Sequence, residues 1–218
     1  MIIITGASDG LGAALVAVAK KVGEKTTNIS RHMSDSADEN IIADLSDVRQ
    51  IKEAAAKIRS ICFPKALILN AGVLSLTSLK DIDESEYERV MNVNLRAPVL
   101  LVAELFEWLV TKGVDVIIVN SIAGLRSFKG QIVYDISKWG LRGFTEDLRL
   151  ELSDTKCRVI GVYPGMLDTN IASKLPSGPL PKSSKPTISS HELATMILQA
   201  IMQPKSMQVS DLVIDRKV

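Results

Sequence analysis

Short apolar runs alternate with longer amphipathic stretches along this chain, and that alternation limits the possible fold more than any other feature. The runs, beginning with Ile2–Thr5, show no polar alternation, which is typical of strands covered on both faces, as in a parallel sheet. The longer stretches repeat apolar residues at helical spacing, as at Leu11, Leu15, Val18 and Val22. The pattern therefore predicts a doubly wound α/β domain.

Seven runs are expected to form strands, at residues 2–5, 26–30, 40–43, 66–70, 114–120, 158–163 and 208–214. Helices are expected at residues 11–22, 47–61, 84–112, 133–152 and 190–203, the third of them broken or bent near Pro98. These elements predict one Rossmann-type domain over residues 1–218, with a mostly parallel seven-stranded sheet and helices on both faces. The proline- and serine-rich residues 173–187 form either a disordered linker or a loop, and we favour a substrate lid at about residues 166–188.

Composition excludes several classes of protein. Of the 218 residues, 46% are hydrophobic and 23% are charged, which is ordinary for a globular protein. The formal net charge of +1 gives no overall field to attract nucleic acid or an anionic membrane. No apolar run reaches the ~18 residues of a membrane span, and two widely separated histidines make a metal site unexpected.

The cysteines and the first residues bear on location. Cys62 and Cys157 cannot form a disulfide scaffold, and both are expected to be small buried side chains in a reducing cytosol. The chain begins with apolar residues and has no basic leader, so we expect no secretory signal. Together these features predict a cytoplasmic protein.

A glycine-rich turn joins the first expected strand to the first expected helix. Glycine permits a tight turn, close approach of a pyrophosphate and close packing of helix on strand. The start of the helix would then offer N–H groups and the positive end of its dipole to the phosphates. A plain tight turn is the alternative, but the position after a strand favours a dinucleotide site. We expect the cofactor to contact Thr5, Gly6, Ser8, Asp9, Gly10, Leu11 and Gly12.

The end of the second expected strand bears on the choice of cofactor. An acidic residue about 20 positions after the turn would bind the ribose 2′-hydroxyl of NAD. This strand ends instead in Ser30 and Arg31, and a guanidinium can clamp a 2′-phosphate. We therefore predict that NADP(H) is preferred, with NAD(H) as the second option. The alternative is that Arg31 is a solvated loop residue.

Tyr134 and Lys138 are four residues apart at the start of an expected helix, so their side chains share one face. A tyrosine pKa near 10 is too high for acid–base work at neutral pH. A neighbouring ammonium favours the phenolate, so we expect Lys138 to lower the pKa of Tyr134. Such a pair also occurs by chance on protein surfaces and needs independent support.

That support comes from polar and glycine residues that follow the expected strands. The carboxyl ends of parallel strands meet at one edge of a sheet, where ligands bind in open α/β folds. We therefore expect one crevice, in line with the glycine turn. It would collect Asn70-Ala71-Gly72, Asn120-Ser121, Pro164-Gly165 and Thr169 from successive strand ends, and Asn94 from the long helix.

With these residues in view, the chain resembles the short-chain dehydrogenase/reductases, in their single-domain subtype, over essentially its whole length. Thr5-Gly6-x-x-x-Gly10-x-Gly12 is similar to the family's cofactor fingerprint. Asp44-Leu45 resembles its adenine-contacting pair, Asn70-Ala71-Gly72 its sheet-stabilising element, and Pro164-Gly165-x-Leu167-x-Thr169 its nicotinamide-side motif. The family's catalytic tetrad is matched by Asn94, Ser121, Tyr134 and Lys138.

The resemblance implies roles for the tetrad. Tyr134 would give a proton to a carbonyl or take one from an alcohol, and Ser121 would hydrogen-bond the substrate oxygen. Lys138 would hold the nicotinamide ribose, and Asn94 would support a water that passes protons to solvent. The implied activity is NADP(H)-dependent interconversion of a small-molecule carbonyl and an alcohol; the alternative is a non-catalytic dinucleotide sensor. Asp9 departs from the pattern of NADP-preferring relatives, which often carry a basic residue there.

The helices expected at residues 84–112 and 133–152 carry more apolar surface than one sheet face needs. Helices with wide apolar stripes commonly bury the surplus against a partner. In the resembled family these two helices pair across a two-fold axis, so we predict a homodimer or homotetramer. The alternative is that the surplus packs only on the sheet.

Overall fold

The computed structural model describes residues 1–175 and 186–217, and its framework is a sheet of seven strands. The strands lie in the order β3-β2-β1-β4-β5-β6-β7, and each neighbouring pair is parallel. The prediction of a parallel seven-stranded, doubly wound sheet is therefore confirmed. The strands are β1 (Ile2–Thr5), β2 (Thr26–Ser30), β3 (Glu39–Ile42), β4 (Ala66–Leu69), β5 (Asp115–Val119), β6 (Val159–Pro164) and β7 (Asp211–Ile214).

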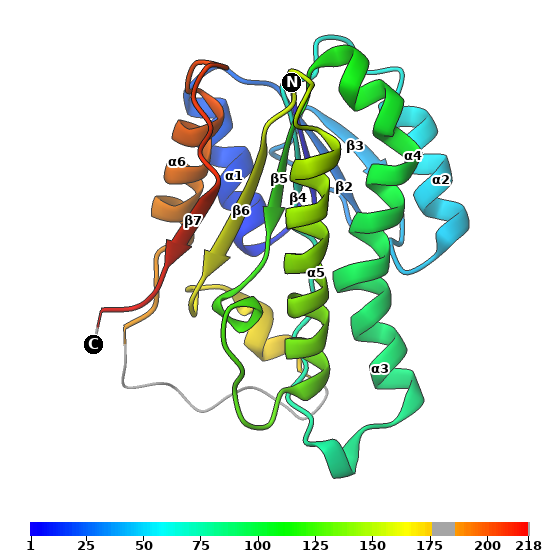
Figure 1. Cartoon of the computed structure of the whole chain (residues 1–218), viewed down its shortest axis with the longest axis vertical. Helices are drawn as coiled ribbons and strands as arrows, with labels where there is room; N and C mark the ends of the chain where they lie inside the picture. Colours follow the sequence, from blue (N-terminus) through cyan, green and yellow to red (C-terminus); the bar gives the residue numbers. More distant parts are fainter. Residues whose placement is uncertain (176–185, 218) are drawn as a thin grey trace.

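Helices cover both faces of the sheet (Figure 1). On one face lie α1 (Gly10–Lys21) and α6 (Ser190–Ile201); on the other lie α2 (Val48–Ile58), α4 (Ala97–Lys112) and α5 (Ile132–Glu151). Alternate residues of one strand enter the two cores: Ile3 packs with the second set of helices, while Ile2 and Ile4 pack with the first. Because both faces are buried, the central strands β1, β4, β5 and β6 are mainly apolar in sequence.

The long helical stretch is interrupted before Pro98, not at it. Helix α3 (Glu84–Met91) passes into a wider π-helical turn at Asn92–Arg96, in which the N–H of Ala97 donates to the carbonyl of Asn92. Pro98 then lies in the first turn of α4, where its missing N–H costs nothing. A proline ring excludes the carbonyl four residues earlier, so the preceding turn widens. The bend therefore falls on the turn that carries Asn94.

The two ends of the segment predicted as a lid are hydrogen-bonded to each other. Leu167 and Ile188 form a parallel bridge, and the N–H groups of Asp168 and Ile188 donate to the carbonyls of Ile188 and Met166, at 3.0 and 2.9 Å. A short 3₁₀ helix, Asn170–Lys174, follows the first end. Residues 176–185 lie outside the described residues, and with them most of the 173–187 stretch.

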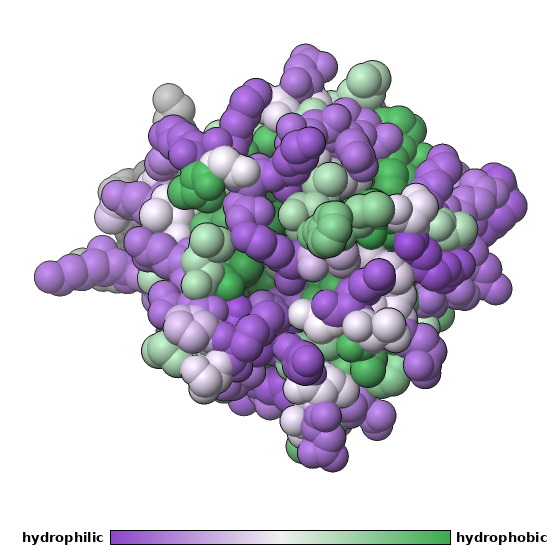
Figure 2. All heavy atoms as spheres, turned by 90° about the horizontal axis from the view of Figure 1, so that it is seen from above, coloured by the Kyte–Doolittle hydropathy of each residue, from purple (hydrophilic) through white to green (hydrophobic). Residues whose placement is uncertain are grey.

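The surface opposite the carboxyl ends of the strands is mainly polar. Seen from above, at the end where the strands begin, hydrophilic side chains dominate and the apolar patches are small (Figure 2). No helix in residues 1–175 or 186–217 is both long and apolar enough to cross a bilayer. Cys157 is buried as expected, but Cys62 is exposed, because it lies in the turn that leads into β4.

Candidate active site

A cleft of about 860 Å³ opens at the carboxyl ends of the strands, which point toward the lower end of Figure 1. Most of the residues predicted for the site line it. They are Gly6, Ser8, Asp9, Gly10, Leu11, Ser30, Arg31, Asp44, Leu45, Asn70, Ala71, Gly72, Ser121, Tyr134, Lys138, Pro164, Gly165, Leu167 and Thr169. Three predicted residues, Thr5, Gly12 and Asn94, are buried and do not line the cleft.

The glycine turn requires the residues that the sequence provides. Gly6 and Gly10 have φ values of 70° and 55°, a region that residues with a side chain rarely adopt. A Cβ on Gly12 would lie 2.1 Å from the carbonyl oxygen of Gly6, so only glycine lets α1 approach the turn this closely. The side chain of Asp9 caps α1 by accepting from the N–H of Gly10 at 2.7 Å.

Thr5 fixes the neighbouring strand end to this turn. Its Oγ1 accepts hydrogen bonds from the N–H groups of Asn70 and Ala71, both at 2.9 Å. The side-chain amide of Asn70 donates back to the carbonyl of Thr5 at 2.9 Å. Thr5 therefore holds residues 70–72 beside the turn without itself entering the cleft. Backbone alone faces the cleft at Gly6, Gly10 and Gly72, and the positive end of α1 faces it too, so this wall fits a dinucleotide pyrophosphate.

The end of β2 forms a hydrogen-bonded corner beside the turn. The Ser30 hydroxyl donates to the carbonyl of His32 at 2.6 Å and lies 3.3 Å from the hydroxyl of Ser8. Asn28, which is fully buried, accepts from the N–H of Ala7 at 3.1 Å and donates to the carbonyl of His32 at 2.9 Å. The exposed Arg31 side chain belongs to this corner and lines the cleft.

Asp44 and Leu45 contribute to the same end in different ways. The carboxylate of Asp44 accepts from the N–H and the hydroxyl of Ser46, at 2.9 and 2.7 Å. These two hydrogen bonds to Ser46 fix the turn that follows β3. The side chain of Leu45 is 7% exposed and packs in the core with α2 and α4, so it is the floor of the cleft at this point.

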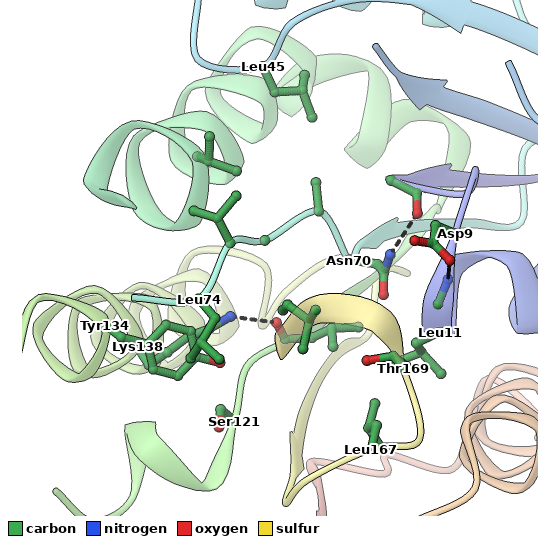
Figure 3. A pocket seen from close by; sticks show the side chains of 18 of the residues that line it. Asp9, Leu11, Leu45, Asn70, Leu74, Ser121, Tyr134, Lys138, Leu167 and Thr169 are labelled. Carbon is green, nitrogen blue, oxygen red and sulfur yellow. Dashed lines mark hydrogen bonds between the residues drawn. The ribbon is translucent and has the colours of Figure 1, made fainter. Parts of the chain in front are cut away.

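Three predicted side chains gather at the opposite end of the cleft (Figure 3). Tyr134 and Lys138 come from the first turns of α5, and Ser121 follows β5. The ammonium of Lys138 lies 5.7 Å from the centre of the Tyr134 ring and donates to the carbonyl of Val119 at 3.2 Å. Ser121 accepts from the N–H of Ala123 at 3.1 Å, which fixes its hydroxyl at the end of the strand.

Asn94 is buried and joins the backbone after β4 to α5. Its side chain accepts from the N–H of Val73 at 2.8 Å and donates to the carbonyl of Val73 at 2.9 Å. The same amide reaches the hydroxyl of Ser137 at 3.1 Å. A Cβ on Gly72 would lie 3.5 Å from the Asn94 oxygen and 3.9 Å from the Lys138 nitrogen, so the backbone of residue 72 lies beside both groups.

Burial, not the neighbouring ammonium, dominates the acid–base chemistry of this end. Burial raises the pKa of Tyr134 to about 12, and a hydrogen bond with Ser121 opposes that rise only in part. The expectation that the pKa of Tyr134 lies below its ordinary value of 10 is therefore wrong, because the loss of solvent around a phenolate outweighs the favourable interactions with its neighbours. Burial also lowers the pKa of Lys138 to about 8.

Other residues of the cleft have no motif in the sequence. Leu74, Phe128, Met166 and Ile171 give the catalytic end an apolar lining, and Gln131 adds an amide. Such side chains are ordinary in a core or on a loop, so no pattern distinguishes them. They come to the site only because the loops after β4, β5 and β6 meet there.

Comparisons with known proteins agree with this arrangement. A family model described as short chain dehydrogenase matches residues 1–179. The chain is 28% identical over 235 residues to the uncharacterized oxidoreductase Lmo0432 of Listeria monocytogenes, covering 97% of this chain and 94% of that protein. A solved short-chain dehydrogenase/reductase from Vibrio parahaemolyticus is 26% identical with a TM-score of 0.86, and both chains are covered completely.

An alcohol dehydrogenase from Thermococcus sibiricus, solved with 5-hydroxy-NADP, has a TM-score of 0.86 at 21% identity and covers 100% of this chain and 96% of its own; that likeness shows the fold. The family match spans more than half of the chain and includes the glycine turn, Ser121, Tyr134 and Lys138. Membership of that family implies a nicotinamide dinucleotide as cofactor and a carbonyl or an alcohol as substrate. This chain belongs to the short-chain dehydrogenase family and is an oxidoreductase of CH–OH and C=O groups.

Proposed function

We propose that the protein interconverts a carbonyl and an alcohol with NADP(H), using Tyr134, Lys138, Ser121 and Asn94 as its proton-transfer site. One observation carries the proposal: the hydroxyls of Tyr134 and Ser121 and the ammonium of Lys138 lie at one end of a cleft whose other end is the glycine turn. A dinucleotide that spans such a cleft brings its nicotinamide end to the three polar groups. When bound, the cofactor supplies or accepts the hydride.

Tyr134 is the proton donor during reduction. Because its pKa is raised to about 12, the side chain keeps its proton at neutral pH and can give it to a carbonyl oxygen. Ser121 donates a hydrogen bond to the same oxygen and stabilises the negative charge that develops on it. During oxidation the transfer runs in reverse: the phenolate form of Tyr134, which the ammonium of Lys138 favours, takes the proton of the alcohol.

Lys138 and Asn94 support that transfer. The ammonium of Lys138 is close enough to the Tyr134 ring to favour the phenolate when a proton has left, and it would hold the nicotinamide ribose. Asn94 fixes Val73 to the helix that carries both residues, through the hydroxyl of Ser137. In that position Asn94 would support a water that relays protons from Lys138 to solvent.

The corner formed by Ser8, Ser30 and Arg31 supports a preference for NADP(H). The Ser8 hydroxyl and the exposed guanidinium of Arg31 supply donors that a 2′-phosphate needs. The hydroxyl of Ser30 donates to the carbonyl of His32 and thereby shapes the corner. Asp9 acts against that preference through its negative charge, so binding of NAD(H) remains the second option.

The remaining proposals concern the organisation of the protein. We take residues 1–218 as one catalytic domain in the cytoplasm, with residues 166–188 as its substrate lid. Assembly into a homodimer or homotetramer through α4 and α5 is supported by Ile136 and Trp139, which are 45% and 44% exposed on α5.

A substrate panel tests the function. Purified protein is mixed with ketones, aldehydes, 3-oxoacyl thioesters or alcohols and with NADPH or NADH, and the nicotinamide absorbance is followed. We expect turnover of at least one carbonyl, faster with NADPH. Tight cofactor binding without turnover of any compound would instead identify a dinucleotide sensor and overturn the proposal.

A further inference from the structure

The carboxylate of Asp135 is buried directly beside the catalytic tyrosine. Asp135 follows Tyr134 on α5 and is 6% exposed. One carboxylate oxygen accepts from the main-chain N–H of Phe128 at 2.8 Å, and the other accepts from the side-chain amide of Gln131 at 2.8 Å. Hydrogen bonds to a charged acceptor are roughly twice as strong as neutral ones.

Both partners of Asp135 belong to the wall of the active-site cleft. Phe128 and Gln131 line it together with Ser121 and Tyr134. We call residues 126–131 the substrate-side segment, because it lies between Ser121 and Tyr134 in the chain and borders the catalytic end of the cleft. Its position therefore helps to set the shape that a substrate meets.

The substrate-side segment has little packing of its own. Residues 126–130 are all exposed, and they form neither helix nor strand. A segment without buried apolar contacts depends on a few hydrogen bonds for its position. Asp135 provides two of them, and Arg126 adds a link by lying 5.3 Å from the centre of the Phe128 ring while it pairs with Asp215.

We propose that Asp135 is a positioning residue, which holds Phe128 and Gln131 against the catalytic helix and thereby sets substrate affinity more than turnover. The proposal rests on the proposed function, since it assigns Asp135 to the same site. Asp135 does not need to touch the substrate, because its two hydrogen bonds act through residues that line the cleft. Its negative charge also helps to keep Tyr134 protonated by raising the pKa of that side chain.

A purely structural role makes a different prediction. Asp135 lies in the first turn of α5, where any carboxylate interacts favourably with the helix dipole. If that were its whole contribution, replacing it would lower thermal stability and leave the Michaelis constant for the carbonyl unchanged. A positioning role, in contrast, predicts a higher KM with little change in kcat, so the two constants distinguish the two roles.

The central variant is Asp135→Asn, which keeps the size of the side chain but replaces one acceptor with a donor. We expect KM for the carbonyl to rise by about tenfold, the effect of replacing a charged acceptor by a neutral amide in these hydrogen bonds, while kcat changes by less than about threefold. Cofactor affinity, measured by fluorescence titration, should stay within about twofold, because the glycine turn is untouched. Hydrogen–deuterium exchange of residues 126–131 should become faster.

Two further variants make the test specific. Gln131→Ala removes one partner without changing α5, so KM should rise again, and the double variant should show less than the product of the two single effects. Asp147→Asn removes an exposed carboxylate from the same helix and should alter neither KM nor exchange.

An unchanged KM in Asp135→Asn, or two effects that multiply in the double variant, would overturn the proposal. If Asp135→Asn does not fold, Gln131→Ala decides: it must raise KM and speed exchange in residues 126–131. If the wild type reduces no carbonyl, the proposed function fails instead. In that case exchange alone shows whether Asp135 holds the segment.

Discussion

The side-chain amide of Asn120 donates a hydrogen bond to the main-chain carbonyl of Lys138 at 3.1 Å. Both residues are buried, at 3% and 4% exposure, so water does not compete for this contact. It fixes the end of β5, which leads into Ser121, to the helix that carries Tyr134. Together with the hydrogen bond from the Lys138 ammonium to the carbonyl of Val119, this contact helps to set the spacing of the three polar groups at the catalytic end.

The packing around Asn120 leaves no room for a larger residue at Gly124. A Cβ there would lie 2.7 Å from the Asn120 oxygen and 2.8 Å from the Lys138 carbonyl. We expect Gly124→Ala to lower the free energy of unfolding by ~1–3 kcal/mol, the usual cost of overpacking, and to reduce turnover. Gly143→Ala on α5, where a Cβ meets nothing within 4 Å, should instead stabilise by ~0.5–1 kcal/mol. Urea titrations compare the two, and equal effects would contradict the assignment.

Removing the proton donor should stop the chemistry but not the fold. Tyr134→Phe keeps the aromatic ring and loses the hydroxyl, so folding and cofactor affinity should survive. Turnover should fall by at least ~10²-fold, the scale of general acid–base catalysis. Steady-state rates and a fluorescence titration of the same preparation check both statements. Near-normal turnover by this variant would sink the proposed mechanism.

Arg31 should determine the preference between the two cofactors. We expect NADPH to bind at least ~10-fold more tightly than NADH, about 1.4 kcal/mol, through the guanidinium. Arg31→Ala should remove most of that difference by weakening NADPH alone. Dissociation constants for both cofactors decide it, and equal values in the wild type would show that Arg31 faces solvent without a role in selection.

Burial of Lys138 should make stability rise with pH in the alkaline range. The pKa of Lys138 is lowered from 10.5 to about 8, so between these values the unfolded chain binds more protons than the folded one. Stability then increases with pH, by at most about 1.4 kcal/mol per unit. Lys138→Met cannot bind this proton. The unfolding free energy of the wild type should therefore increase relative to that of the variant from about pH 7.5 to about pH 9.5.

The upper limit of that window comes from Tyr134. Its pKa is raised to about 12, so its contribution is complete below the ordinary value of 10 and is lost as the pH climbs through about 12. Below pH 10, therefore, only Lys138 and not Tyr134 contributes to the change of stability with pH. A difference between wild type and Lys138→Met that does not vary with pH would mean that the ammonium stays protonated in the folded protein.

Assembly should depend on the exposed apolar face of α5. Light scattering at micromolar concentration should give two or four times the mass of one chain. Trp139→Glu should shift the protein toward the monomer, because it puts a charge into the proposed contact. Met202→Glu changes a residue that is 52% exposed after α6, on the other face of the sheet, and should leave the mass unchanged. A wild-type monomer with full activity would exclude the interface.

The sequence is informative wherever a local rule leaves one solution. Unbroken apolar runs indicate strands buried on both faces. The role of Gly12 can be predicted because a Cβ at this position would lie 2.1 Å from the carbonyl oxygen of Gly6. The roles of Asn120 and Asp135 are not readable, because each depends on a partner that the fold brings near. The pKa of Tyr134 was expected to move the wrong way for the same reason: spacing reveals the ammonium, but only the packed structure reveals the loss of solvent.

The bridge between Leu167 and Ile188 has a consequence for how this protein can change. The chain leaves the end of β6 through Leu167 and returns through Ile188 before α6. Because these two residues are paired with each other, the length of the segment between them need not affect the sheet. The entropy of closing a loop grows slowly, by only ≈ 0.6 kcal/mol for each doubling of its length. Insertions and deletions between these residues are therefore cheap for the fold, while they alter a border of the cleft. Selection, natural or in the laboratory, can exchange this stretch for another without redesigning the enzyme around it.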